Sequence, residues 1–401
     1  MRIAFITYEY PPDIAQGGIA TYVQQAAKIL FNRGNDVEIF CASHTRDISE
    51  LIDGINVHRC KVNNPIQFQT ACVKIFTIRH LLKAFDVMES PEINANAIKL
   101  KEKFPAIPLV VKLHMPLYVQ MKLFNFYTSF FTKCRFFLGG LRRGQIQKYG
   151  YHNHLNDADY KITKMANAIV SPSKSLKQII INDWKIADNQ IDVIPYPFKP
   201  TPQLLAIPVQ NIVTNKVTFI GKLNVHKGVV NLVKAIPFVI KKNPNVLFTL
   251  IGNDSEFSTK KMLMSKYIQQ QLKGYEKNYI IKGGLIYEDV LKEYETATLC
   301  IFPSIWENFP LVCLEAMSAG RPIIGSTQGG MSELLDNEAG ILIDPLNVNQ
   351  MGESICKLLS NVSLRNKLGT VARKKVLANY NSEIIGKRLE EHFQNTIGGK
   401  N

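Results

Sequence analysis

The sequence predicts an α/β protein with two doubly wound parallel sheets, one in each half of the chain. Three observations indicate this class. Short apolar strands alternate with segments whose apolar residues recur at helical spacing, an order typical of parallel sheets. The 401 residues are enough for two domains of ordinary size. A proline-rich stretch at 195–208 separates two series of such elements.

The first half opens with an apolar strand at Ile3–Thr7. A helix follows, because apolar residues recur at helical spacing from Ile19 to Leu30 and Arg33-Gly34 can end it. Further strands are expected at Val37–Phe40, Ile55–His58, Asp86–Glu89, Leu109–Leu113 and Ala168–Val170.

Five prolines lie between Pro195 and Pro208, and they fix so many φ angles that we expect a stiff, extended connector there. The domains are therefore expected to span 1–200 and 201–380. The second contains strands at 216–220, 246–251, 279–281, 299–302 and 322–325 and a helix at 229–241, and the chain ends in helices at 349–359, 364–378 and 384–393.

The composition, with 46% hydrophobic and 20% charged residues, is that of a soluble globular protein. Seven cysteines occur singly, which favours reduced thiols in a cytoplasmic protein over a disulfide framework or a zinc site. The amino terminus lacks the features of a signal peptide, and no uncharged apolar run approaches the length of a membrane span.

The formal net charge is +15, which calls for an anionic partner. No helix-turn-helix, zinc finger or aromatic RNA-binding signature is present, so nucleic acid is not the expected partner. Anionic lipid or a phosphorylated substrate explains the charge more simply.

The basic residues gather in one region, because no Asp or Glu occurs from Lys103 to Asn156. Within it, the stretch from Tyr118 to Tyr151 mixes aromatic residues with lysine and arginine. One interpretation is an interfacial helix on an anionic membrane, at the inner face of the plasma membrane. The other is that the aromatics close the core of the first domain while the basic side chains reach outward to water.

The most informative stretch is 307–322. Glu307 follows the apolar strand 298–302, so it lies on the loop at the carboxyl end of that strand, where open α/β sheets bind ligands. Pro310 suits the start of a helix, and Gly320 and Pro322 end it. Glu315 falls inside this apolar helix and needs a hydrogen-bonding partner, because an unpaired buried carboxylate is costly.

Two glutamates separated by seven residues and followed by Ala316-Met317-x-x-Gly320-x-Pro322 resemble the retaining glycosyltransferases of the GT-B fold, specifically glycosyltransferase family 4. The resemblance implies two Rossmann-like domains facing across a cleft. The first binds the acceptor, and the second binds a nucleotide-sugar. The last helix, at about 381–401, is implied to cross back onto the first domain.

In the second domain the resemblance places Glu307 at the donor sugar and Glu315 at the nucleotide ribose. Without the resemblance, Lys222 and Lys227 would be interpreted as ordinary solvated loop charges. The resemblance implies that both bind the diphosphate of the donor. The glycine-rich loop 325–330 opens a helix, whose free N–H groups could also meet phosphate. The resemblance also implies donor contacts at Gly221, Asn253, Gly284, Leu285, Asn308, Phe309, Pro310 and Leu311.

In the first domain Gly17-Gly18 opens a helix and could cradle an anion, and relatives place such a loop at the donor phosphate. The spacing is not that of a nicotinamide-binding loop. His114 follows a strand and by itself is usually structural, but the resemblance implies contact with the donor sugar. Catalytic roles are thus expected for Glu307, His114 and Lys227.

We expect no metal or other cofactor. Asp157 and Asp159 lie in a helical segment, where side chains two residues apart point about 200° apart and cannot grip one ion. We expect both to be surface charges, and His152 and His154 have the same geometry.

The expected function is retaining transfer of a sugar from a nucleotide-sugar to a glycan or lipid-linked acceptor, in surface polysaccharide biosynthesis. Two alternatives remain at this point: a sugar-nucleotide epimerase of the same fold, and a catalytically silent glycan-binding subunit.

Overall fold

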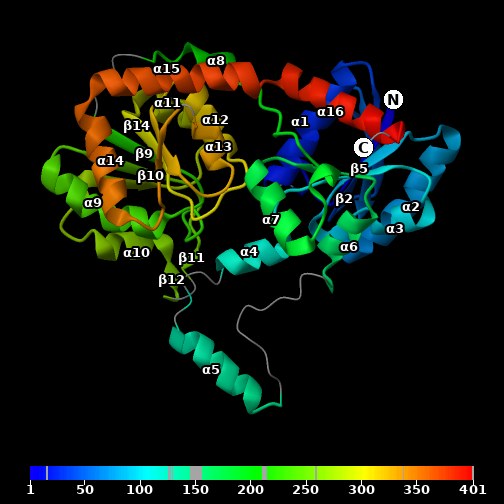
Figure 1. Ribbon diagram of the computed structural model, residues 1–401, viewed down its shortest axis with the longest axis horizontal. Coiled ribbons are helices and arrows are strands. Elements are labelled where there is room, and N and C mark those ends of the chain that lie inside the picture. Colours follow the sequence, from blue (N-terminus) through cyan, green and yellow to red (C-terminus); the bar gives the residue numbers. More distant parts are fainter. Residues whose placement is uncertain are drawn as a thin grey trace. The chain divides into compact units, whose positions relative to one another are not determined.

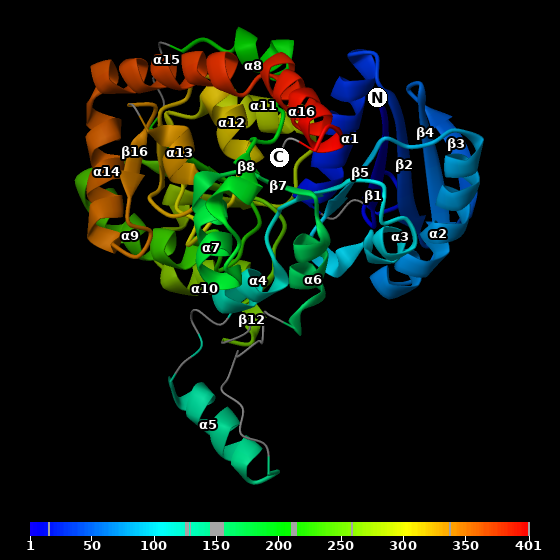
Figure 2. The same ribbon diagram turned by 45° about the vertical axis from the view of Figure 1, so that its right-hand side comes forward.

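Parallel strand pairing organises both halves of the computed structural model, which describes residues 1–14, 17–124, 128, 130–144, 156–209, 215–257, 260–336 and 338–399. The chain divides into two compact units. Unit 1 comprises Met1–Gln120, His152–Phe198 and Tyr380–Asn401, and unit 2 comprises Met121–Tyr151 and Lys199–Asn379. Figures 1 and 2 show the elements of each unit in two orientations.

Unit 1 is built on a sheet of order β3-β4-β2-β1-β5-β6-β7-β8. β1 is buried along its whole length, as expected for a strand covered on both faces. It lies between β2 and β5, so the strand order reverses there and creates a switch point at its carboxyl end. The strands are β1 (Arg2–Thr7), β2 (Asp36–Ser43), β3 (Ile48–Ile52), β4 (Ile55–Lys61), β5 (Val87–Pro91), β6 (Leu109–Lys112), β7 (Ala168–Ser171) and β8 (Ile191–Val193).

The predicted parallel sheet is correct for this unit except at one edge. β3 was not predicted, and it pairs antiparallel with β4 through a tight connection at Asp53-Gly54. Both turn residues have positive φ, at 52° and 85°, which suits a short hairpin connection. β8 was also not predicted, because a three-residue strand leaves almost no periodicity to detect.

Polar caps begin several helices of unit 1. Asn64 accepts a hydrogen bond from Gln67 N at α2, and Ser173 accepts one from Leu176 N at α7. The helices are α1 (Gly18–Asn32), α2 (Pro65–Leu82), α3 (Ile98–Lys103), α6 (Ala158–Met165), α7 (Lys174–Trp184) and α16 (Ser382–Ile397).

The final helix, α16, packs on α1 although about 350 residues separate them in the chain. Glu390 pairs with Arg33 at 2.8 Å and accepts a hydrogen bond from Asn35 at 2.8 Å. Gly386 permits the close approach, because a Cβ there would lie 2.3 Å from Ile29 Cγ2. Unit 1 is therefore completed by the last segment of the chain.

Unit 2 has a parallel six-stranded sheet of order β13-β10-β9-β14-β15-β16. The order reverses between β9 and β14, which places a switch point at their carboxyl ends. The strands are β9 (Lys216–Ile220), β10 (Leu247–Ile251), β13 (Tyr279–Lys282), β14 (Leu299–Phe302), β15 (Ile323–Ser326) and β16 (Ile341–Ile343). A small antiparallel pair, β11 (Glu256–Phe257) with β12 (Met262–Leu263), follows β10.

The core of unit 2 lies between the sheet and the buried faces of α9 and α14. Its helices are α8 (Pro202–Ala206), α9 (Val229–Lys242), α10 (Met264–Gln271), α11 (Tyr287–Thr296), α12 (Leu311–Ser318), α13 (Met331–Leu335), α14 (Val348–Ser360) and α15 (Val362–Asn379). The predicted extended connector is wrong at α8, because Thr201 caps a short helix with Pro202 at its first position.

In the described part of the aromatic, basic stretch lie the helices α4 (Leu117–Phe124) and α5 (Phe130–Leu141). Tyr118 is buried, with its ring centroid 5.7 Å from that of Trp184, as the core interpretation predicts. In α5, however, Phe130 and Phe131 are 75% and 83% exposed, so these rings close no core. Phe126 and Tyr151 lie outside the described residues. Among the residues that the structure describes, no helix is both long and apolar enough to cross a bilayer.

Candidate active site

The centre of the candidate site in unit 2 is an ion pair between Lys227 and Glu307. Lys227 precedes α9 and Glu307 follows β14, so two loops beyond the neighbouring strands β9 and β14 bring them together. Ser304 Oγ donates to the same carboxylate oxygen at 3.3 Å. The side chains are 29% and 17% exposed, so the pair is accessible to a ligand.

The backbone holds these two loops in register. Ile305 N donates to His226 O at 2.8 Å, and Lys227 N donates to Asn224 Oδ1 at 2.9 Å. Gly228 has φ of 74°, and a Cβ there would lie 1.8 Å from Pro303 O. Only glycine fits this contact, which sets Lys227 against Glu307.

A second group of predicted donor-binding residues gathers at the ends of β9, β10 and β13. Leu223 N donates to Asn253 O at 2.9 Å, which joins the loops after β9 and β10. A Cβ on Gly252 would lie 2.0 Å from Gly221 O, and one on Gly284 would lie 2.4 Å from Asn253 Oδ1. The backbones of the loops after β9 and β10 therefore approach closely, and Gly284 lies against the side chain of Asn253.

Lys222 lies in the same loop as Gly221 and is exposed, whereas Leu285 is half-buried. An exposed lysine in the same loop as the partly buried Lys227 supplies a second positive charge near these residues. The two cations differ in one respect that the sequence did not reveal: Lys227 already has an anionic partner in Glu307.

Glu315 in α12 has the hydrogen-bonding partner that its apolar surroundings require. Tyr294 Oη donates to Glu315 Oε2 at 3.0 Å and is 3.1 Å from Val312 O. Burial raises the pKa of Glu315 to about 7, although the tyrosine hydrogen bond opposes that shift. Tyr294 was not predicted from the sequence, since it looks like one more buried aromatic on α11.

The segment between the two glutamates is well packed. Asn308, Phe309 and Pro310 are buried, and Pro310 caps α12, so the helix begins at Leu311. The two carboxylates of this segment belong to Glu307 and Glu315. The buried residues between them hold the two glutamates in place relative to each other.

The glycine-rich loop after β15 contacts the backbone of Glu307. Gly330 N donates to Glu307 O at 2.8 Å, so this amide is not available to a phosphate. Gly329 has φ of 70°, and a Cβ there would lie 2.1 Å from Glu307 O. The loop thus supports the backbone of Glu307.

In unit 1, His114 lies just beyond β6 and is buried. Its backbone N donates to both carboxylate oxygens of Glu92 at 2.9 Å, and its Nδ1 is 2.7 Å from Tyr196 Oη. Burial, followed by the charge of Lys112, holds the pKa of His114 well below its ordinary value. The imidazole is therefore neutral near pH 7 and can act as a hydrogen-bonding group, not as a cation.

Around His114 lies a buried polar cluster that sequence reasoning missed: Lys112, Glu89, Tyr22 and Tyr196. Lys112 Nζ donates to Ile194 O at 2.5 Å and lies 4.9 Å and 5.3 Å from the ring centroids of Tyr22 and Tyr196. Burial lowers the pKa of Lys112 to about 7 and raises that of Glu89 to about 7. The available signal was a lysine inside the apolar strand 109–113.

Gly17 and Gly18, at the start of α1, are exposed, and a Cβ on either would meet nothing within 4 Å. Packing within unit 1 does not require glycine at either position. The space beside this helix end is open to a ligand.

Asp159 is not the surface charge that the sequence suggested. It is buried and accepts hydrogen bonds from Asn94 N at 3.0 Å and Leu117 N at 2.9 Å, which explains how a carboxylate is tolerated there. Asp157 is the N-cap of α6 and is half-buried. His152 and His154 lie outside the described residues, among which no cluster of His, Cys, Asp and Glu is arranged to hold a metal.

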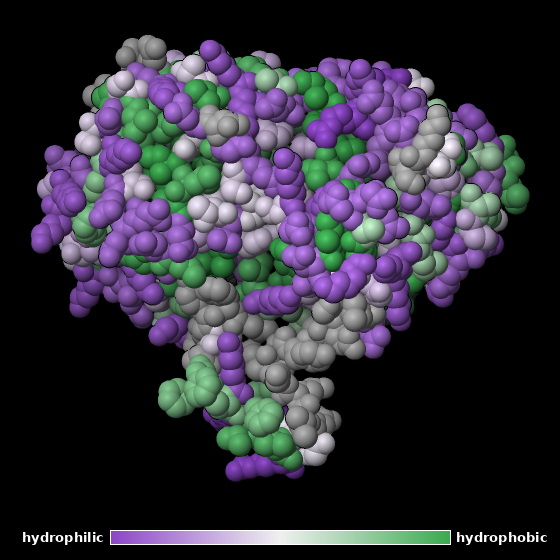
Figure 3. All heavy atoms as spheres, viewed as in Figure 1, coloured by the Kyte–Doolittle hydropathy of each residue, from purple (hydrophilic) through white to green (hydrophobic). Residues whose placement is uncertain are grey.

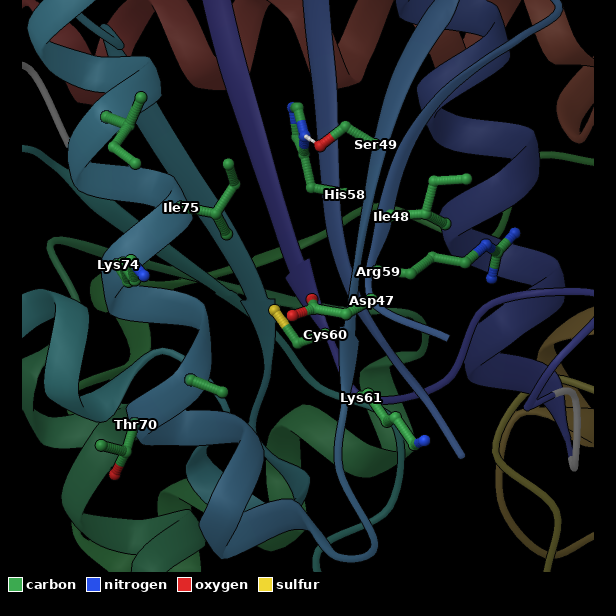
Figure 4. Close-up of a pocket in the computed structure, with 12 residues that line it drawn as sticks. Asp47, Ile48, Ser49, His58, Arg59, Cys60, Lys61, Thr70, Lys74 and Ile75 are labelled. Carbon is green, nitrogen blue, oxygen red and sulfur yellow. Dashed lines mark hydrogen bonds between the residues drawn. The ribbon is translucent and has the colours of Figure 1, made fainter. Parts of the chain in front are cut away.

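A cavity of about 570 Å³ lies elsewhere in unit 1, between α2 and the β3–β4 edge. Figure 4 shows that its walls come from these elements, with Ser49 hydrogen-bonded to His58. None of the predicted site residues lines it, so it is separate from the candidate active site.

Family comparisons agree with the arrangement of strands and site residues. Residues 16–200 match the model described as Glycosyltransferase Family 4, and residues 214–361 match the model described as Glycosyl transferases group 1. The two matches together cover most of the chain. The chain therefore belongs to the family 4 (group 1) glycosyltransferases, and it is a glycosyltransferase with the GT-B fold.

Three similar proteins illustrate the relationship. An uncharacterized glycosyltransferase of Methanocaldococcus jannaschii is 24% identical, with 96% of each chain covered. A GDP-mannose-dependent monoacylated alpha-(1-6)-phosphatidylinositol monomannoside mannosyltransferase of Corynebacterium glutamicum is 28% identical over 43% of this chain and 45% of its own. The structure of Anabaena HepE in complex with UDP-glucose superposes with a TM-score of 0.68 at 16% identity, covering 98% of this chain and 100% of that chain.

Proposed function

We propose that this protein transfers a sugar from a nucleotide-sugar donor to a glycan or lipid-linked acceptor, with retention of anomeric configuration. The observation that carries the donor assignment is the Lys227–Glu307 pair at the switch point of unit 2. The complex of HepE with UDP-glucose, a protein of the same fold, supports a donor of this chemical class.

The cations act on the leaving group. As the bond between the anomeric carbon and the diphosphate oxygen breaks, negative charge grows on the diphosphate. Lys227 and Lys222 are proposed to stabilise that charge, which lowers the barrier because the interaction strengthens in the transition state.

The departing diphosphate is proposed to accept the proton of the acceptor hydroxyl, while the acceptor oxygen bonds to the anomeric carbon on the face that the leaving group vacates. This front-face step retains configuration and needs no second carboxylate as a nucleophile. Glu307 and the neutral His114 are proposed to hold the sugar hydroxyls during transfer.

Glu315 is proposed to accept hydrogen bonds from the nucleotide ribose. Its partner Tyr294 occupies one carboxylate oxygen in the structure, and the other can face a ligand. Gly221, Asn253, Gly284 and Leu285 are proposed to contact the nucleotide with their backbones.

The proposed class of acceptor rests on the name of one relative. The mannosyltransferase of Corynebacterium glutamicum acts, by its name, on a phosphatidylinositol mannoside, which is a membrane glycolipid. We propose a comparable glycan-bearing lipid or growing surface polysaccharide as the acceptor of this chain.

The test is to measure release of nucleoside diphosphate from a panel of nucleotide-sugars, with and without lipid-linked saccharides. Acceptor-dependent release, with the product anomer of the same configuration as the donor by NMR, is expected. Conversion of the donor without an acceptor would support a sugar-nucleotide epimerase. Tight nucleotide binding without turnover on any acceptor would indicate a silent binding subunit.

A further inference from the structure

One face of α5 exposes hydrophobic side chains that the described structure leaves in solvent. At about 100° per residue, one arc of the helix is formed by Phe130, Phe131, Cys134, Phe137, Leu138 and Leu141. Phe131 is 83% exposed, Leu138 56% and Leu141 45%. Figure 3 shows hydrophobic residues gathered over this helix beside hydrophilic ones. Such a continuous apolar arc on the surface usually marks a binding face.

Basic side chains border this arc on both sides. Lys133 lies beyond Phe137 on one edge and Arg135 lies beyond Phe131 on the other, and Arg142 and Arg143 directly follow the helix. All four are exposed. This part of the sequence contributes no carboxylate to offset them, because it lacks Asp and Glu from Lys103 to Asn156.

This combination selects one kind of partner. A helix of 12 residues is about 18 Å long, too short to span a hydrocarbon core of about 30 Å. An apolar arc with cations at its edges can instead lie in the plane of a bilayer, with its rings among the acyl chains and its cations at the headgroups. The cations then face the anionic headgroups, and each of them contributes favourably to the free energy of membrane binding.

We propose that α5 docks this protein on an anionic membrane surface by lying in the interface without crossing it. The helix belongs to the connection between β6, which leads into His114, and β7. The docking rests on α5 and not on the proposed transfer reaction, so the two proposals can fail separately.

Charge dependence is tested by vesicle flotation of the full-length protein. Vesicles of phosphatidylcholine alone are compared with vesicles that also contain phosphatidylglycerol, at low and high salt. Binding is expected only to the anionic vesicles and to weaken with salt, because exposed charges are screened over about 8 Å at physiological ionic strength.

The variant Arg142→Glu/Arg143→Glu should reduce binding about 10-fold or more. Its matched control is Lys241→Glu/Lys242→Glu, an adjacent exposed pair at the end of α9 with the same charge change, which should bind like the native chain. Equal binding to both vesicle types, or equal loss in both variants, would overturn the proposal.

The orientation of α5 is tested by tryptophan placement. Phe131→Trp, within the apolar arc, should be quenched by brominated lipid and shift its emission to the blue on anionic vesicles. Gly139→Trp, on the opposite face, should do neither, although both variants float with the vesicles. The reverse pattern, or no quenching at either site, would contradict interfacial insertion.

The variant Phe131→Ser/Leu138→Ser distinguishes docking on a membrane from binding to another protein. On the proposal it loses vesicle binding and keeps the sedimentation behaviour of the native chain. If instead it converts a dimer to a monomer and leaves vesicle binding intact, α5 is a contact between copies of this chain. If it abolishes transfer to a water-soluble acceptor, α5 belongs to the acceptor site.

Discussion

At the scale of single residues, the proposed site of unit 2 centres on the ion pair between Lys227 and Glu307. Glu307 neutralises Lys227 in the structure, and Ser304 shares the same carboxylate oxygen. A diphosphate that binds here must therefore compete with, or join, an anion that the protein itself supplies. We therefore expect the two residues to have opposite effects on nucleotide affinity.

Lys227→Ala is expected to lower turnover about 10²-fold or more, because a charge-stabilising group is lost while Glu307 remains to repel the diphosphate. Steady-state kinetics with the preferred donor measure the effect. Lys234→Ala, on the exposed side of α9, is the matched control and should behave like the native enzyme. Native turnover in Lys227→Ala would remove the residue from the mechanism.

The two glutamates should respond in opposite directions. Glu307→Gln removes the competitor for Lys227, so nucleoside diphosphate should bind more tightly while kcat falls. Glu315→Gln should weaken nucleotide binding and raise KM, because ribose contacts are made equally in ground and transition states. Calorimetric titration and initial rates distinguish the two outcomes, and equal changes in both variants would argue against separate roles.

Glu315 also links the site to stability. Its folded-state pKa of about 7 lies above its ordinary value, so the unfolded chain loses this proton first as pH rises. Stability attributable to Glu315 is then lost between about pH 4.5 and 7 and stays lost above that range. Glu315→Gln should therefore increase the free energy of unfolding at pH 8 by about 1 kcal/mol or more, and raise Tm accordingly. At pH 4 the substitution should have little effect. Thermal unfolding at both pH values measures this; an equal gain at each would mean packing, not ionisation, is responsible.

At the scale of elements, the loops beyond β9 and β14 depend on glycine where backbones nearly touch. Gly228 combines positive φ with a contact that leaves no space for a Cβ. Other glycines of unit 2, such as Gly274, have positive φ in open space. Comparing substitutions at Gly228 and Gly274 therefore distinguishes the cost of backbone strain from the cost of a steric clash.

Gly228→Ala is expected to destabilise the protein by about 2–5 kcal/mol, from left-handed strain and overpacking together, and to displace Lys227 from Glu307. Gly274→Ala should lose only the strain, about 1–2 kcal/mol, with normal kinetics. Denaturant unfolding and donor KM provide the measurements. Similar losses in both variants would show that the contact with Pro303 can relax.

Strand and helix identity was largely predictable at this scale, because long apolar runs and helical spacing are local properties of the chain. The strands beginning at Leu109, Lys216 and Leu299 and the helix after Pro310 lie where the sequence predicts them. β3 and α8 were missed, because a short strand with exposed residues and a helix within a proline-rich stretch carry little periodicity.

At the scale of the whole molecule, the proposed donor-binding residues of unit 2 lie at the carboxyl ends of the neighbouring strands β9, β10, β13 and β14. Binding of nucleoside diphosphate should therefore stabilise the folded state by about 2.7 kcal/mol at 100 times its Kd. A thermal-shift screen of nucleoside diphosphates identifies the preferred base. Hydrogen exchange should slow in the loops at 221–228, 252–254 and 304–310. Protection spread over the cavity beside α2 instead would place the nucleotide elsewhere.

The sequence alone determined the class of fold and the order of most elements, since spacing and turn chemistry are encoded locally, and its resemblance to glycosyltransferase family 4 supplied the residues expected to bind a nucleotide-sugar. Only tertiary structure decided which charges are buried and which are paired. Asp159 and Glu89 look like ordinary charged residues in the sequence, yet both are buried in the folded unit. Lys227 and Glu307 are 80 residues apart and become neighbours only because β9 and β14 pair in parallel. Burial and ion pairing depend on such long-range contacts, which no local pattern records.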